Sequence, residues 1–128
     1  MNILRPIDIE DEIRLALNDH FTTYVRPLPE KYTLPNLLIT ATGGTSKDTI
    51  DTFIVTIDAR GETDASAYIT LSNALGVLEK KANMQSGNLR NVAINSLTRW
   101  GNDPVRPDLK LCTGTVVVTC HRESFDIS

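Results

Sequence analysis

The sequence has few of the residues that most often carry chemistry. Two cysteines and two histidines among 128 residues do not supply four zinc ligands at the usual short spacings. No apolar run exceeds three residues, whereas a membrane-spanning helix needs about 20. The 13 basic residues are scattered and the formal net charge is −3, so the basic stripe typical of a dedicated nucleic-acid binder is missing. We therefore expect no membrane segment and no sequence-specific nucleic-acid binding.

The two cysteines, Cys112 and Cys120, lie in one strand-like run. Eight residues of extended strand would separate them by roughly 27 Å, but a disulfide requires Cα atoms within about 7 Å. We expect no disulfide between them and interpret both as small apolar residues in a reducing compartment. The start of the chain has no apolar signal-peptide region, which also favours the cytoplasm.

The overall composition is that of an ordinary globular protein. Hydrophobic residues make up 41% and charged residues 23% of the chain, and a chain of this size buries about two-thirds of its surface on folding. Its length predicts a single domain over residues 1–128.

Hydrophobic periodicity predicts two helices and four strands, the first of them short. The helices are expected over residues 7–21 and 64–81, and the strands over residues 37–42, 49–59, 91–100 and 109–122. Three prolines restrict any strand within residues 24–35 to an edge or a connection. The pattern predicts an α+β fold in the order helix, hairpin, helix, hairpin. Both helices are expected on one face of a mostly antiparallel sheet.

Motifs for catalysis are missing from the sequence. There is no Gly-x-Ser-x-Gly, and nothing local joins His20 or His121 to a nucleophile. Cys120 and His121 are adjacent on a strand, so their side chains point to opposite faces. Asp103 and Asp108 flank a proline-rich loop, where turn chemistry explains them better than a bound cation. We predict no catalytic, metal-ligating or cofactor-binding residues.

The segment from residue 42 to residue 49 has the composition of a phosphate-binding loop but not its pattern. In a phosphate loop the lysine is followed by serine or threonine and then a helix, whereas Lys47 precedes Asp48 and a predicted strand. We interpret the segment as a projecting hairpin loop in which Gly43 and Gly44 supply positive φ, and Gly114 as the mark of a bulge in the last strand. The residues expected to contact partners are Gly43, Gly44, Thr45, Ser46, Lys47, Asp48, Trp100 and Arg106.

The order of elements resembles that of the tail terminator proteins of long-tailed bacteriophages, the lambda-type tail completion family. Residues 4–122 carry the resemblance. Its most suggestive short features are Thr42-Gly43-Gly44 before a polar loop and Pro107-Asp108 before the last strand.

The resemblance implies a structural virion protein without catalysis or cofactors. Such a protein forms a hexameric ring that ends polymerisation of the tail tube and joins the tail to the head. Its partners would be copies of itself, the tail tube protein and a head–tail connector protein, after assembly in the host cytoplasm. The residues leave three alternatives open: another neck or head-completion protein, a small α+β enzyme or ligand-binding domain, and a monomeric adaptor.

Overall fold

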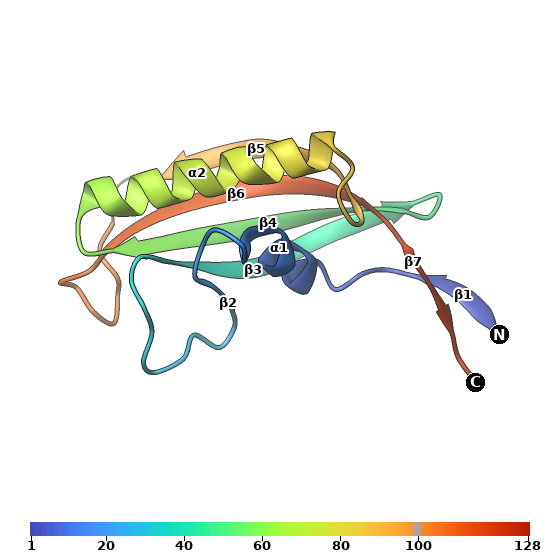
Figure 1. The fold of residues 1–128 in the computed structure, drawn as a ribbon, viewed down its shortest axis with the longest axis horizontal. Helices are drawn as coiled ribbons and strands as arrows, with labels where there is room; N and C mark the ends of the chain where they lie inside the picture. The colour runs from blue at the N-terminus through green and yellow to red at the C-terminus, as the bar shows by residue number, and fades with distance from the viewer. Residues whose placement is uncertain (99–100) are drawn as a thin grey trace.

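The structure is a computed structural model that describes residues 1–98 and 101–128. Within these residues the chain forms two helices and seven strands (Figure 1). In chain order the elements are β1 (Asn2–Arg5), α1 (Ile9–Leu17), β2 (Thr23–Val25), β3 (Asn36–Lys47), β4 (Ile50–Gly61), α2 (Asp64–Asn83), β5 (Leu89–Thr98), β6 (Lys110–His121) and β7 (Glu123–Asp126).

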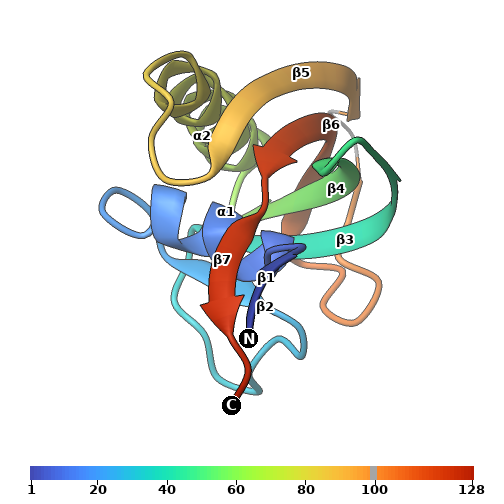
Figure 2. The same cartoon turned by 90° about the vertical axis from the view of Figure 1, so that its right-hand side faces the viewer.

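Five of the strands form one sheet in the order β2-β3-β4-β6-β5. All neighbours in it are antiparallel except β2 and β3, which are parallel. Both helices lie on one side of the curved sheet (Figure 2). The structure is therefore α+β with a mostly antiparallel sheet, as the sequence predicts. Strands β1 and β7 were not predicted, and together with β2 they make the predicted order of elements incomplete. Strand β2 lies at the edge of the sheet, the position to which the prolines restrict a strand in this region.

Capping residues begin both helices. Asp8 accepts a hydrogen bond from the Asp11 amide before α1, and Thr63 accepts one from the Ser66 amide before α2, which satisfies amides that have no partner within the helix. Helix α2 agrees with prediction, but α1 ends at Leu17 rather than at residue 21. The chain turns there because β2 must begin at Thr23 to pair with β3.

The core lies between the helices and one face of the sheet. Strand β4 contributes Val55, Ile57 and Ala59, all fully buried, and this is the buried face that their alternation predicts. The helices contribute a stripe of fully buried side chains from each: Ile13, Leu17, Ala67, Leu71, Ala74 and Leu78.

The first long hairpin is more regular than predicted. Residues 43–47 belong to β3 and pair with β4 as far as Lys47 opposite Ile50, so the expected loop is reduced to a two-residue turn. Asp48 and Thr49 take positive φ values of 53° and 64°, the conformation of a type I′ turn. The prediction that Gly43 and Gly44 supply positive φ is therefore wrong.

The irregularities of the sheet also differ from prediction. Bulges lie between Ala41 and Gly43 on β3, and twice on β5. Gly114 keeps a regular register with Ile57 on β4 and Leu97 on β5, so it marks no bulge. A Cβ atom there would lie 3.2 Å from a Leu71 methyl group. The glycine instead allows α2 to pack closely on β6.

Cys112 and Cys120 both lie on the core face of β6 and are buried. The two thiols are not joined to each other, as their separation along one strand predicts. Burial, with the nearby carboxylates of Glu12 and Asp51, raises the pKa of the Cys120 thiol to about 12.

Candidate functional site

The structure places the predicted contact residues at two different ends of the sheet. Residues 43–48 lie at the tip of the β3–β4 hairpin, where Ile50 pairs with His121, and every residue from 42 to 50 is exposed. Arg106 lies in the loop that precedes Lys110, at the other end of β6. Twelve residues of strand separate these ends by roughly 36 Å. Trp100 lies outside the described residues.

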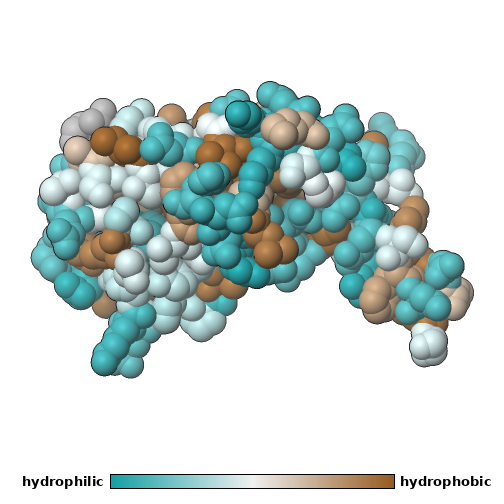
Figure 3. Space-filling view, in the orientation of Figure 1, coloured by the Kyte–Doolittle hydropathy of each residue, from teal (hydrophilic) through white to brown (hydrophobic). Residues whose placement is uncertain are grey.

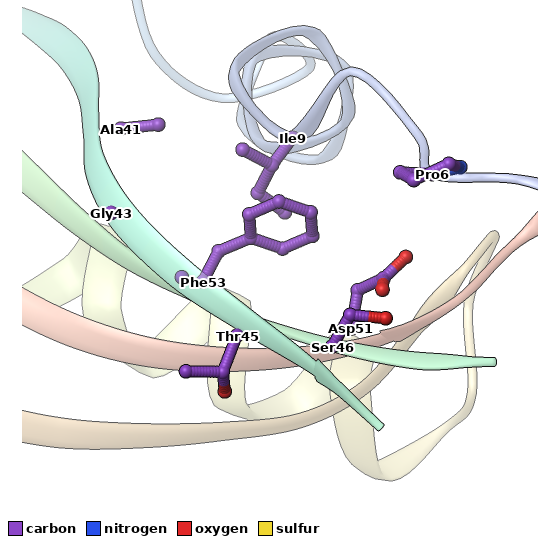
Figure 4. Close-up of a pocket in the computed structure, with 9 residues that line it drawn as sticks. Pro6, Ile9, Ala41, Gly43, Thr45, Ser46, Asp51 and Phe53 are labelled. Carbon is purple, nitrogen blue, oxygen red and sulfur yellow. The ribbon is translucent and has the colours of Figure 1, made fainter. Parts of the chain in front are cut away.

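An apolar groove of roughly 420 Å³ runs beside the hairpin (Figure 4). Ile9 and Phe53 point toward one another across it, and Pro6 closes one end (Figure 4). Strand β3, from Ala41 to Ser46, forms one wall of the groove. Thus four of the predicted contact residues, Gly43, Gly44, Thr45 and Ser46, line a single feature.

The side of β3 that faces away from β4 is open along residues 43–47. Strand β2 pairs only with Leu37–Ile39, and the Glu10 carboxylate of α1 accepts the Ala41 amide at 2.8 Å. Lys47 and Ile50 flank the two-residue turn and so form a hydrogen-bonded pair. Alternation then directs the backbone groups of Ser46 and Gly44 away from β4. We call residues 43–47 the open edge of β3; in the described chain no strand pairs with it.

A charged cluster joins the hairpin to the start of β7. Arg122 donates to both oxygens of the Asp51 carboxylate, at 3.0 and 3.1 Å, and to the Ser46 hydroxyl at 2.6 Å. These bonds from Arg122 outweigh the effect of burial and hold the pKa of Asp51 below its ordinary value of 3.8. The cluster fixes the direction in which the chain leaves β6.

A second buried ion pair lies at the other end of the sheet. Arg60 donates to Asp103 at 2.7 Å, and both side chains are almost fully buried. Burial alone would raise the pKa of Asp103. Hydrogen bonds from Arg60 and from the amides of Val105 and Arg106 prevail, and the pKa is lowered. Asp103 therefore organises the loop that presents Arg106, which forms an exposed ion pair with Asp108.

The sheet face opposite the helices has no helix over it in the described chain. Across its middle runs an apolar row in which Ile54 pairs with Gly43 and Val117, and Val117 pairs with Ala93. Ile54 is 42% exposed. Threonines of β3, β4 and β6 flank the row and share its face: Thr40, Thr45, Thr52, Thr56, Thr113, Thr115 and Thr119. A β-branched, nearly uncharged surface suits contact with another protein.

Side chains that could together hold a metal ion are not gathered in any of these described places. In residues 1–98 and 101–128 no three His, Cys, Asp or Glu side chains lie close enough to hold a metal ion. His20 lies in the turn after α1, and His121 ends β6; both are exposed. No helix of the described chain is long and apolar enough to cross a membrane.

Sequence reasoning missed two of these features. It did not identify Arg122 and Asp51 as partners, because 71 residues separate them. A signal existed: Asp51 occupies a core-facing position of an alternating strand, where a carboxylate requires a partner. It also missed β1 and β7, whose four-residue strands are too short for alternation to be distinctive.

Comparison with known proteins adds no family assignment. No protein-family model matches the chain, and the search of curated proteins finds no match.

Proposed function

We propose that this protein is a structural component of a bacteriophage virion, a tail terminator. In this role it forms a hexameric ring on the last ring of the tail tube, stops tube growth and provides the surface for joining to the head. The protein itself supplies no catalysis and uses no cofactor. Its partners are other copies of the chain, the tail tube protein and a head–tail connector protein.

The observation that carries the proposal is the position of the free strand edges. On one side of the sheet the edge is β5, and on the other it is β2 with the open edge of β3 beyond it; within residues 1–98 and 101–128 no further strand pairs with either side. The two edges differ in sequence and environment, so contacts that cover them in neighbouring copies are head-to-tail. Contacts of that kind close into rings when the rotation between copies permits it. A ring gives every copy a neighbour on both sides, so an edge that would otherwise stay open, such as that of β3, can be covered in every copy.

The difference between the two ends of the sheet supports the proposal that the protein contacts two different partners. The β3–β4 hairpin tip and the loop with Arg106 lie at opposite ends of β6 and differ in chemistry. A terminator requires this difference, because one face of its ring binds a tube end and the other must not accept a further tube ring. The α+β fold with a mostly antiparallel sheet is also compatible with the resemblance to tail terminators that the sequence indicates.

The direct test uses a phage that encodes this chain, with the gene deleted and resupplied from a plasmid. Tails of uncontrolled length that do not join heads are expected without the gene, and normal virions with it. Tails of normal length that fail to join heads would instead indicate another neck protein. Normal virions without the gene would contradict the proposal.

Native mass spectrometry of the purified chain, alone and with tail tube protein, provides a second test. A species of six copies is expected, at high concentration or on the tube end, because contacts linked in a ring reinforce one another. A compact monomer that binds a small molecule saturably, and does not respond to tubes, would favour the ligand-binding alternative.

A further inference from the structure

Strands β1 and β7 form a two-stranded ribbon that stands apart from the rest of the molecule. They pair antiparallel from Asn2 opposite Asp126 to Arg5 opposite Glu123. Among the helices and strands described, neither makes more than marginal contact with any element except the other. In Figure 3 the ribbon is a separate lobe at the lower right of the molecule. Two-stranded ribbons are marginally stable alone in water, so this one requires a surface to pack on.

One face of the ribbon is apolar toward its tip. Ile3 and Phe125 are cross-strand partners, and Ile127 follows on the same face. Phe125 is 40% exposed and Ile127 44% exposed. At its root Arg5 forms an ion pair with Glu123 at 2.7 Å and lies over the Phe125 ring at 3.6 Å. The opposite face is polar apart from Leu4. No element of the described chain covers the apolar face.

The groove beside β3 has the complementary properties. Its floor is apolar, with Ile9 and Phe53 facing each other (Figure 4). Its rim is the open edge of β3, five residues long, where Gly44 and Ser46 direct backbone groups outward. The ribbon strands are four residues long and each has one unpaired edge. A strand added there would complete the ladder and place alternate side chains over the groove.

We infer that the ribbon of one copy docks on the groove and open edge of β3 in a second copy of this chain. The inference rests on the proposed function, since it assigns the contact between neighbours in the ring. Donor and acceptor are different surfaces of one molecule, so the contact is head-to-tail and repeats around a ring. Strand β5 is the less suitable occupant of the groove because two bulges interrupt its ladder, and bulged edges resist pairing.

Chemical cross-linking between different copies tests the contact directly. A ribbon variant, Ser124→Cys, is mixed with a hairpin variant, Lys47→Cys, and treated with a short bis-maleimide. Both positions are exposed, whereas Cys112 and Cys120 are buried in the core. The mixture is expected to give a cross-linked dimer, and each variant alone is not. A chain with both substitutions that cross-links only within itself, while the mixture does not react, would overturn the inference.

Two charge substitutions on opposite faces of the ribbon provide a matched comparison. Phe125→Asp places a carboxylate on the apolar face and is expected to raise the concentration for half-assembly by about tenfold or more, as loss of a central apolar anchor does. Ser124→Asp adds the same charge on the other face and is expected to leave assembly unchanged. Both should melt like the original chain, because the body makes little contact with the ribbon. Equal effects of the two substitutions on assembly would contradict the inference.

The outcomes separate this contact from the ring itself. If six-copy species form but the cross-link does not, the proposed ribbon contact is contradicted and the ring proposal is not. A protein that stays monomeric at every concentration, with and without tube ends, would contradict both the ribbon contact and the ring.

Discussion

Arg122 holds both carboxylate oxygens of Asp51, although the two residues lie 71 positions apart in the chain. Asp51 is at the start of β4 and is almost completely buried, so its charge depends on this partner. Because Arg122 is also the residue that precedes β7, the pair sets where the ribbon leaves the body. Stability of the hairpin and position of the ribbon are therefore linked at one ion pair.

Removing Arg122 is expected to destabilise the fold. Arg122→Ala leaves a buried carboxylate without its partner, which typically costs roughly 3–5 kcal/mol for a fully buried pair. We expect about 2 kcal/mol of unfolding free energy to be lost, because Arg122 is partly exposed. Urea unfolding measures the change. Arg106→Ala breaks the exposed pair with Asp108 and is the control, expected to leave the free energy of unfolding close to that of the original chain because exposed ion pairs contribute little. Similar losses in both variants would contradict the role given to Asp51.

Stability is expected to fall in acid because of Asp51 and Asp103. The pKa of each is lower in the folded chain than its ordinary value of 3.8. The unfolded chain therefore binds protons first as the pH falls. The two ionised carboxylates contribute their full stabilisation when the pH is above their ordinary pKa of 3.8. This stabilisation is lost as the pH falls through the lowered pKa of the folded chain. Thermal unfolding followed from pH 6 downward should show the loss beginning at about pH 4 to 5. Asp51→Asn should weaken this dependence; an unchanged profile would exclude Asp51 as a contributor.

The long elements could be predicted from the sequence because one face of each is continuously apolar. In strands β4 and β6 successive residues alternate between core and solvent, and in helix α2 the buried residues recur every three or four positions. The predicted bounds of all three differ little from the observed ones. Residues 43–47 could not be recognised as strand, because they are polar on both faces. Only their pairing with β4 makes them a strand. Their position at the hairpin end was nevertheless predicted.

The groove and the ribbon could not be predicted for a different reason. The groove combines Pro6 and Ile9 with Phe53, and the ribbon combines Ile3 with Phe125. Each combination depends on contacts between distant parts of the chain, which local periodicity does not encode. Short strands also bury too little surface to leave a hydrophobic pattern.

The two cysteines are expected to react only after unfolding. Burial raises the pKa of Cys120 to about 12, so the thiolate that reacts with thiol reagents is scarce near neutral pH. Cys112 is equally inaccessible. In native protein a thiol reagent should therefore modify neither residue at neutral pH. In denaturant without reductant it should modify both. Recovery of an intramolecular disulfide from native protein would contradict the assignment of both residues to β6.

The adjacent glycines of β3 should differ sharply when each is replaced by alanine. A Cβ atom on Gly44 would lie 2.6 Å from the Thr52 carbonyl oxygen and 3.2 Å from the Phe53 ring, whereas a Cβ atom on Gly43 meets nothing within 4 Å. The Thr52 carbonyl is backbone in the centre of the hairpin and cannot move aside without disturbing the pairing. We therefore expect Gly44→Ala to cost about 1–3 kcal/mol, as overpacking does.

Gly43→Ala is the matched control, because it adds the same methyl group one residue away on the same strand. We expect it to change the unfolding free energy by less than about 0.5 kcal/mol, since neither glycine has a positive φ that alanine would avoid. Chemical denaturation of the two variants side by side measures the difference. Equal stability would show that the hairpin shifts to accept the methyl group, and the wall of the groove that Gly44 forms would then be less rigid than its packing indicates.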